Sequence, residues 1–303
     1  MQQRLDRVTE EVRQTLERLL GERNTLLEAV TQRLERDTRI AAAWLFGSLG
    51  RGEGDALSDL DLFVVVRDAD FDEMVGSVSA RKVFIRQAGG DPIVFGEAPQ
   101  NAPPQGAYAG ILYAGEVSPH RADWYWQPQS MAVLPQSDAA VLFDRVGIRR
   151  SEAPVSWEYQ PIPEESIEEE ASRACSGFWA MLLITAKYVA RTPREDGMGL
   201  LKWAYVSLNQ MERFLWLEPT AEEGMPSTEA ADGRTEDYTD PHIKLALLRR
   251  LTARMQDLSP LLAARGVLLP DGKIVSQSYR YLDLLERTCV GRDETGSAGA
   301  RLP

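Results

Sequence analysis

Two short apolar segments joined by a glycine-rich stretch constrain the fold of this chain more than any other feature. Residues 40–46 read IAAAWLF and end at Gly47, and residues 59–66 read DLDLFVVV. Each segment is too short for a buried helix, and the second is rich in β-branched residues, so both predict buried strands. The stretch between them, GSLGRGEG, contains glycines that allow a tight turn and a close approach of the backbone to a ligand.

The second segment begins with a pair of carboxylates. Asp59 and Asp61 are two residues apart, so on a strand both side chains point to the same face. Like charges this close repel one another unless a cation neutralises them, and a sparse set of oxygen ligands suits Mg²⁺, which completes its shell with water and substrate phosphates. Gly47 and Ser48 add backbone N–H groups and a hydroxyl after the first strand. These residues together predict a site for a magnesium-bound nucleoside triphosphate.

The spacing Gly47-Ser48-x10-Asp59-Leu-Asp61 resembles the signature of the polymerase-β-like nucleotidyltransferase superfamily, over roughly residues 40–130. The resemblance implies a mixed sheet with flanking helices, and transfer of a nucleotidyl group with release of pyrophosphate. It also implies a third carboxylate on a later strand, which binds metal and accepts the proton of the acceptor hydroxyl. Asp123, in the stretch HRADWYW, fits this position. Alternatives for the third carboxylate are Asp91, Glu97 and Glu116.

The other elements of the first 150 residues follow from hydrophobic periodicity. Residues 3–36 have apolar side chains at helical spacing, and Gly21 leaves open whether they form one helix or two. A further helix is expected over residues 71–87. Short strands are expected at 92–95, 110–113 and 121–126.

The chain changes character near residue 150. We predict an α/β nucleotidyltransferase domain over residues 1–150, a linker over 151–163, an all-helical domain over 164–292 and a disordered tail over 293–303. Helices are expected at about 164–191, 197–217, 241–257 and 277–291, and an exposed acidic loop at 218–240.

This helical half is similar to that of the antibiotic nucleotidyltransferases, which act on aminoglycosides and lincosamides. That resemblance implies that a lysine of the helical domain contacts the triphosphate, as Lys187 would, with Lys202 a weaker candidate. A lysine at the edge of a helix is the alternative interpretation. Arg51 and Ser58 are further candidates for nucleotide binding. The alternative for Arg51 is a solvated loop arginine, and for Ser58 the favoured interpretation is a serine that caps or braces the turn.

Composition limits the partners. The chain has 34 Lys and Arg against 46 Asp and Glu, a net charge of −12, which disfavours nucleic acid and anionic membranes and favours a cationic ligand. Only two cysteines and two histidines are present, so neither a disulfide framework nor a histidine-rich zinc site is expected. We expect a soluble, cytoplasmic protein with no membrane-spanning segment.

The sequence therefore predicts a Mg²⁺-dependent enzyme that transfers a nucleotidyl group, in the first instance adenylyl from ATP, to a hydroxyl of a small molecule such as an aminoglycoside-like antibiotic. Alternatives are an antitoxin-type enzyme that nucleotidylates a partner protein, and a non-catalytic nucleotide-binding protein. The acceptor, the preferred NTP and the oligomeric state are not determined by the sequence.

Overall fold

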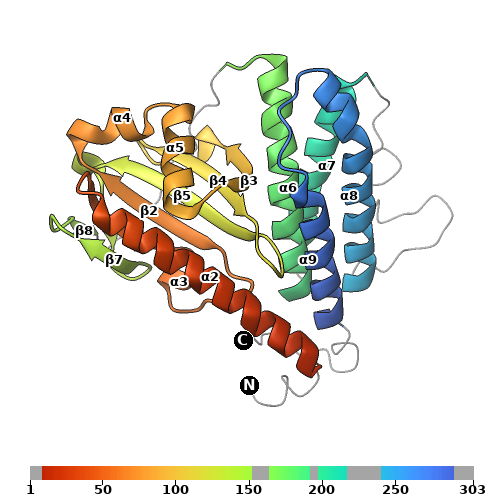
Figure 1. Ribbon diagram of the computed structural model, residues 1–303, viewed down its shortest axis with the longest axis horizontal. Helices are drawn as coiled ribbons and strands as arrows, with labels where there is room; N and C mark the ends of the chain where they lie inside the picture. Colours follow the sequence, from red (N-terminus) through yellow and green to blue (C-terminus); the bar gives the residue numbers. More distant parts are fainter. Residues whose placement is uncertain (1–8, 152–163, 192–196, 217–239, 290–303) are drawn as a thin grey trace. The chain divides into compact units, whose positions relative to one another are not determined.

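The computed structural model describes residues 9–151, 164–191, 197–216 and 240–289 (Figure 1). The chain divides into two compact units, one formed by residues 18–164 and the other by residues 1–17 and 165–303. The first unit is built on a mixed sheet and the second is helical, which confirms the predicted fold class.

The sheet of the first unit has six strands in the order β3-β4-β5-β2-β1-β7. Neighbouring strands are antiparallel except for β2 and β5 at the centre, which are parallel. The strands are β1 (Ile40–Leu45), β2 (Leu60–Val66), β3 (Pro92–Glu97), β4 (Ala107–Tyr113), β5 (His120–Pro128) and β7 (Ala140–Asp144). A separate two-stranded sheet pairs β6 (Leu134–Pro135) with β8 (Arg150–Ser151).

The structure answers one open question about the helices of this unit and corrects one expectation. Helix α2 (Glu10–Arg36) continues through Gly21 without a break. The helix expected over 71–87 is divided into α4 (Phe71–Val75) and α5 (Val78–Gly89), because the Ser77 side chain accepts a hydrogen bond from the Ala80 N–H and caps a new helix. The glycine-rich stretch contains a single short turn of helix, α3 (Gly47–Gly50).

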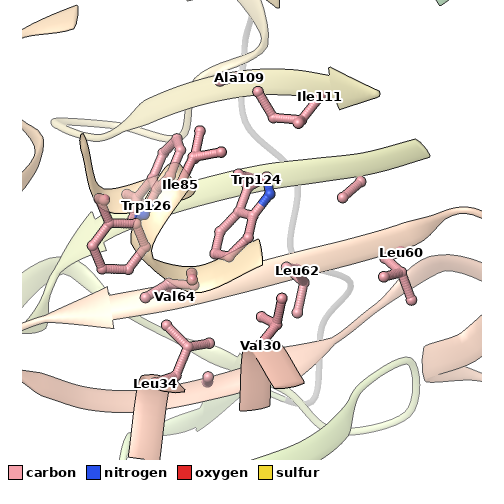
Figure 2. Packing of buried hydrophobic residues seen from close by; sticks show 14 of the residues in the cluster. Val30, Leu34, Leu60, Leu62, Val64, Ile85, Ala109, Ile111, Trp124 and Trp126 are labelled. Atoms are coloured by element: carbon pink, nitrogen blue, oxygen red, sulfur yellow. The ribbon is translucent and has the colours of Figure 1, made fainter. Parts of the chain in front are cut away.

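Strand alternation separates two cores, one on each face of the sheet. Leu60, Leu62, Val64 and Val66 of β2 pack with Trp124 and Trp126 against helices α2, α4 and α5 (Figure 2). On the opposite face, Phe63 and Val65 pack with residues of the segment 132–148. Period-2 alternation on β2 therefore buries leucine and valine under the helices and turns Asp61 to the other face.

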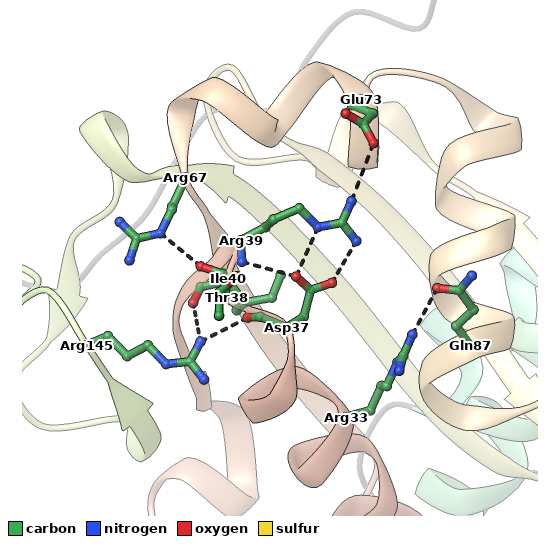
Figure 3. A network of polar contacts seen from close by, with 9 residues as sticks. All are labelled: Arg33, Asp37, Thr38, Arg39, Ile40, Arg67, Glu73, Gln87 and Arg145. Carbon is green, nitrogen blue, oxygen red and sulfur yellow. Dashed lines mark hydrogen bonds and ion pairs between the residues drawn. The ribbon is translucent and has the colours of Figure 1, made fainter.

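A polar network fixes the end of α2 to the neighbouring strands (Figure 3). Arg145 donates to the carbonyl oxygens of Asp37 and Ile40, at 2.9 and 2.6 Å, and to that of Glu35. Arg145 follows β7, a strand that the sequence did not predict. Because β7 is an edge strand with half-exposed side chains, its segment lacks the continuous apolar run that identified β1 and β2.

The helical unit contains α6 (Ile167–Arg191), α7 (Gly197–Phe214), α8 (Pro241–Ala264) and α9 (Lys273–Cys289). Asp240 caps α8 by accepting from the His242 N–H at 2.8 Å, as the Asp-Pro pair predicts. Helices α8 and α9 are respectively longer and displaced relative to the expected ranges. The expected acidic loop up to residue 239, the linker beyond Ser151 and the tail fall outside the described residues.

No helix in the described ranges has the length and apolar character needed to cross a membrane.

Candidate active site

The pairing of β2 with β5 brings Asp61 and Asp123 together. These strands are parallel, and Asp61 is the register partner of Asp123. Paired residues of parallel strands point to the same face, so both carboxylates lie on the face opposite α2 and α5. Asp59 comes two residues before Asp61 and shares that side. The predicted carboxylate trio is thus assembled near the beginning of two adjacent central strands.

Gly47 packs directly against the carboxylate of Asp61. The glycine has φ of +64°, and a Cβ atom at this position would lie 2.2 Å from Asp61 Oδ2. The backbone N–H of Phe46 also donates to the Asp61 carbonyl oxygen at 3.0 Å. Glycine is therefore required at position 47 for two reasons, a left-handed backbone and close contact with a site carboxylate. Ser48 follows within the short helix α3.

Asp123 is held by two neighbours on its own face of the sheet. Arg121 donates from Nη2 to Asp123 Oδ1 at 2.7 Å and from Nε to Oδ2 at 3.1 Å. The Tyr108 hydroxyl donates to Oδ1 at 2.8 Å. Position 110 on β4 is glycine, where a Cβ would lie 3.3 Å from Asp123 Oδ1 and 3.1 Å from the Tyr108 hydroxyl. The Asp123 carboxylate is consequently bound on both oxygens.

Arg121 also reaches the first carboxylate of the trio, with its Nε 4.0 Å from Asp59 Oδ2. The side chains of Arg121 and Asp123 are only 11% and 12% exposed. Burying either of these charges alone would cost desolvation free energy, and the ion pair between Arg121 and Asp123 offsets that cost.

Burial and neighbouring charges shift the pKa values in this cluster. Burial raises the pKa of Asp123, and the nearby Asp59 charge raises it further, while Arg121 opposes both. Burial also raises the pKa of Tyr108, so this hydroxyl stays protonated and remains a donor to Asp123. For Arg121, burial alone would lower the pKa, but the charges of Asp123 and Asp59 outweigh burial and raise it.

A row of aromatic rings crosses the sheet beside the carboxylates. Trp44 stacks on Phe63 with ring centroids 4.5 Å apart, and Phe63 is stacked on Tyr125 at 6.3 Å. Tyr125 meets Tyr108 edge to face at 4.8 Å. The row fixes the ring of Tyr108, and hence the hydroxyl that donates to Asp123.

Helix α2 anchors the segment that leads into Asp59. The side chain of Arg23, which is buried, donates from Nη1 to the carbonyl oxygens of Asp55 and Ser58 at 2.5 and 3.4 Å. Within this segment the Ser58 hydroxyl accepts from the Asp55 N–H at 2.9 Å and donates to Asp55 Oδ1 at 3.1 Å. Residues 55–58 are thereby held in one conformation immediately before the first carboxylate.

The neighbouring residue of α2 anchors the beginning of β5. Glu22 Oε2 accepts from the backbone N–H of Glu116 at 3.0 Å and lies 2.9 Å from His120 Nε2. Burial lowers the pKa of His120, and the contact with Glu22 works in the opposite direction. Gly115 lies so close that a Cβ there would be 2.6 Å from Glu22 Oε2. Adjacent residues of one helix thus hold the starts of both carboxylate-bearing strands.

The remaining candidates lie in different surroundings. Ser58 is engaged in the turn described above, and Arg51 pairs with Glu53 at 3.0 Å on an exposed loop. Lys187 belongs to α6 of the helical unit, where it is buried and lies 5.6 Å from the ring of Tyr188.

The alternative third carboxylates lie away from the register pair. Asp91 pairs with Arg86 in an exposed position. Glu97 lies on β3, two strands away from β5, and pairs with Arg81 of α5. The backbone of Glu116 is tied to Glu22 in the turn between β4 and β5.

The donor chemistry of the trio suits Mg²⁺, because the ligands that these three residues offer are carboxylate oxygens. In the described residues, however, no group of three or more His, Cys, Asp or Glu side chains has the arrangement of a formed metal site. The guanidinium of Arg121 contacts two of the three carboxylates, Asp59 and Asp123.

Four residues of this arrangement were not identified from the sequence: Arg121, Tyr108, Arg23 and Glu22. Arg121 was recoverable, because strand alternation puts residues 121 and 123 on the same face. Tyr108 lies on the preceding strand, β4, and Arg23 and Glu22 lie on α2, so no local pattern around Asp59 or Asp123 marks these three residues.

The part of the chain that carries the site matches a known family. Residues 28–82 match the model of the family described as polymerase beta, nucleotidyltransferase. The matched range includes Gly47, Ser48, Asp59 and Asp61 and ends before Asp123. No curated protein matches the chain. The family match therefore supports a likeness of residues 28–82 of this α/β unit to the polymerase-β-like nucleotidyltransferase superfamily.

Proposed function

We propose that this protein transfers a nucleotidyl group from a nucleoside triphosphate, in the first instance ATP, to a hydroxyl group of a small molecule, and that the reaction depends on Mg²⁺. The observation that carries the proposal is the register of Asp61 with Asp123 across parallel strands, with Gly47 packed on the Asp61 carboxylate. That arrangement lies on the unit whose residues 28–82 match a nucleotidyltransferase family.

Asp59 and Asp61 are the residues that would hold Mg²⁺, joined by Asp123. The chemistry that the ion supplies when bound is neutralisation of the triphosphate charge. The backbone N–H groups at Gly47 and Ser48, together with the Ser48 hydroxyl, bind the terminal phosphates and orient pyrophosphate as the leaving group. Arg51, Ser58 and Lys187 remain candidates for further contacts with the nucleotide.

Asp123 takes the proton of the acceptor hydroxyl at a carboxylate oxygen as that hydroxyl attacks the α-phosphorus. A general base works best when its pKa is near the operating pH, and burial raises the pKa of Asp123 in that direction. Its assignment as the base requires that an oxygen be released from the contacts with Arg121 and Tyr108.

The decisive test is pyrophosphate release with each of the four NTPs and a panel of hydroxylated antibiotics, including aminoglycosides and lincosamides. Wild-type protein should release pyrophosphate with at least one acceptor in the presence of Mg²⁺. Asp61→Asn should lower the rate by more than about 100-fold, since even the outer partners of metal ligands cost 10–100-fold.

Asp91→Asn is the matched control for this variant. It also removes one negative charge, but from an exposed pair with Arg86 whose contribution to stability is small. Wild-type turnover in Asp61→Asn would refute the site. Absence of transfer to any small molecule, together with nucleotidylation of a co-purified protein, would favour the protein-modifying alternative.

A cationic acceptor is favoured by the net charge of −12. Binding of an aminoglycoside should then weaken steeply once salt exceeds 0.1 M, where the Debye length is about 10 Å. Isothermal titration at low and high salt, with an ATP analogue and Mg²⁺ present, measures this dependence. A neutral acceptor such as a lincosamide would bind with little dependence on salt.

A further inference from the structure

The guanidinium of Arg121 lies against carboxylates that, in a metal-dependent site, would be expected to bind the metal ion. It makes a two-pronged contact with Asp123, at 2.7 and 3.1 Å, and lies 4.0 Å from Asp59. The fork geometry engages both oxygens of Asp123, and Tyr108 occupies Oδ1 as well. Those are the oxygens that Asp123 would offer to a metal ion.

The ion pair between Arg121 and Asp123 is also buried rather than exposed at the surface. Arg121 and Asp123 lie on the same strand and face, with side chains 11% and 12% exposed. The absence of a side chain at Gly110 leaves the space in which they meet, since a Cβ there would be 3.4 Å from Arg121 Nη2. Charge-assisted, bidentate pairs of this kind are among the stronger hydrogen-bonded contacts in proteins.

We propose that Arg121 is an internal counter-ion of the site, which neutralises Asp123 and Asp59 without metal and must withdraw from Asp123 before this carboxylate binds a divalent cation. The inference rests on the proposed function, because it takes the carboxylate trio to be the metal site. Arg121 therefore sets the affinity for metal by competition, and it acts through Asp123 as a positioning residue.

Competition between Arg121 and the metal ion for Asp123 predicts the direction in which metal affinity changes when Arg121 is replaced. Each divalent ion that binds through Asp123 has to break the contact with Arg121, so the apparent affinity for the ion is lowered by the stability of that contact. Removing the guanidinium should strengthen metal binding, although it removes a residue from the site. A role for Arg121 that is only structural would leave metal affinity unchanged or weaken it.

The test measures Mn²⁺ binding, as a paramagnetic substitute for Mg²⁺, by electron paramagnetic resonance of the free ion without nucleotide. Arg121→Gln should bind Mn²⁺ at least about tenfold more tightly than wild type, the change that 1.4 kcal/mol produces. Arg86→Gln is the control: it removes the same charge from the exposed pair with Asp91 and should leave the affinity unchanged.

A double-mutant cycle with Asp123→Asn identifies the carboxylate through which Arg121 acts. In the wild-type background this change should weaken Mn²⁺ binding modestly, because Arg121 already occupies Asp123. In the Arg121→Gln background the same change should cancel most of the gain. Equal effects in both backgrounds would contradict the proposal.

If Arg121→Gln does not fold, a second variant and an NMR measurement on the wild-type protein still test the proposal. Arg121→Lys keeps a buried cation but cannot form the two-pronged contact, and it should bind Mn²⁺ several-fold more tightly. In wild type, the Arg121 Nε–H resonance, assigned by its loss in Arg121→Lys, should shift when Mg²⁺ is added.

The outcomes separate this inference from the proposed function. If wild type binds Mn²⁺ in a manner that Asp61→Asn abolishes, but the Arg121 variants bind no more tightly, the metal site stands and the role of Arg121 is refuted. If neither wild type nor the Arg121 variants bind Mn²⁺, both the inference and the proposed metal site are wrong.

Discussion

Strands β2 and β5 carry the same kind of side chain to the same face of the sheet but treat it differently. On β2, Asp61 lies against the bare backbone of Gly47 and is partly exposed. On β5, Asp123 is buried and bound by Arg121 and Tyr108. The difference shows that two carboxylates on the same face of a sheet can have different surroundings, because Asp61 packs against a glycine backbone whereas Asp123 is buried in an ion pair with Arg121.

The comparison predicts opposite consequences for stability, and this is the largest effect we expect. Asp123→Asn leaves Arg121 buried without its main partner, which should lower the free energy of unfolding by about 3–5 kcal/mol. Asp61→Asn removes one of several like charges and should leave stability unchanged or higher without metal. Urea unfolding of both variants measures the contrast, and equal losses would erase the distinction between the strands.

A substitution on α2 should loosen the segment that leads into β2. Arg23→Met removes charged donors to the carbonyl oxygens of Asp55 and Ser58, and should lower the free energy of unfolding by about 1.5–3 kcal/mol. It should also lower turnover, because the segment before Asp59 loosens. Arg33→Met, at an exposed position of the same helix, should change stability by less than about 0.5 kcal/mol. A loss of stability with full turnover would show that the anchor does not position Asp59.

A pair of glycine variants isolates the contact at Asp61. Gly47 and Gly52 both have positive φ, +64° and +69°, so alanine at either should cost about 1–2 kcal/mol of stability. Only at Gly47 would the new Cβ meet the Asp61 carboxylate, since nothing lies within 4 Å of a Cβ at Gly52. Gly47→Ala should therefore weaken Mn²⁺ binding and Gly52→Ala should not. Equal metal affinities in the two variants would show that Asp61 accommodates the methyl group.

The smallest effect concerns the beginning of β5 and its dependence on pH. Burial lowers the pKa of His120 in the folded protein, so the folded state binds fewer protons than the unfolded state. This contribution to stability is complete above the ordinary histidine pKa of about 6.5 and is lost as the pH falls through the region below it. His120→Gln should therefore give a shallower decline in unfolding free energy between about pH 7 and pH 5.

Glu22→Gln should act in the opposite direction, because the Glu22 carboxylate is the group that raises the pKa of His120 against burial. Urea unfolding at a series of pH values measures both variants. Parallel profiles for wild type and His120→Gln would show that His120 does not contribute to the decline.

Much of the fold could be predicted because its signals are local. The apolar runs at 40–46 and 59–66 marked β1 and β2, and helical periodicity marked α2 and the helices of the second unit. Edge strand β7 was missed because its side chains are half-exposed. The break between α4 and α5 was missed because a serine cap within an apolar pattern outweighed the periodicity.

For the site, the sequence by itself determined which chemical groups are available: the glycine that leads into Ser48, the carboxylates of Asp59 and Asp61, and a third acidic residue on a later strand. Spacing of two along a strand sufficed to place Asp59 and Asp61 on one face, since that periodicity is a property of the backbone.

Only the tertiary structure decided that Asp123 rather than Asp91, Glu97 or Glu116 pairs in register with Asp61. It also decided that Arg121 and Tyr108 bind Asp123, and that adjacent residues of α2 hold the two strand starts. The physical reason is that, apart from the contact of Arg121 with Asp123 on one strand, these contacts join different elements of the fold: Tyr108 is 15 residues from Asp123, and Arg23 and Glu22 are 32 and 94 residues from Asp55 and Glu116. Burial and charge at such a contact depend on which segments meet in space, and no local pattern along the chain contains that information.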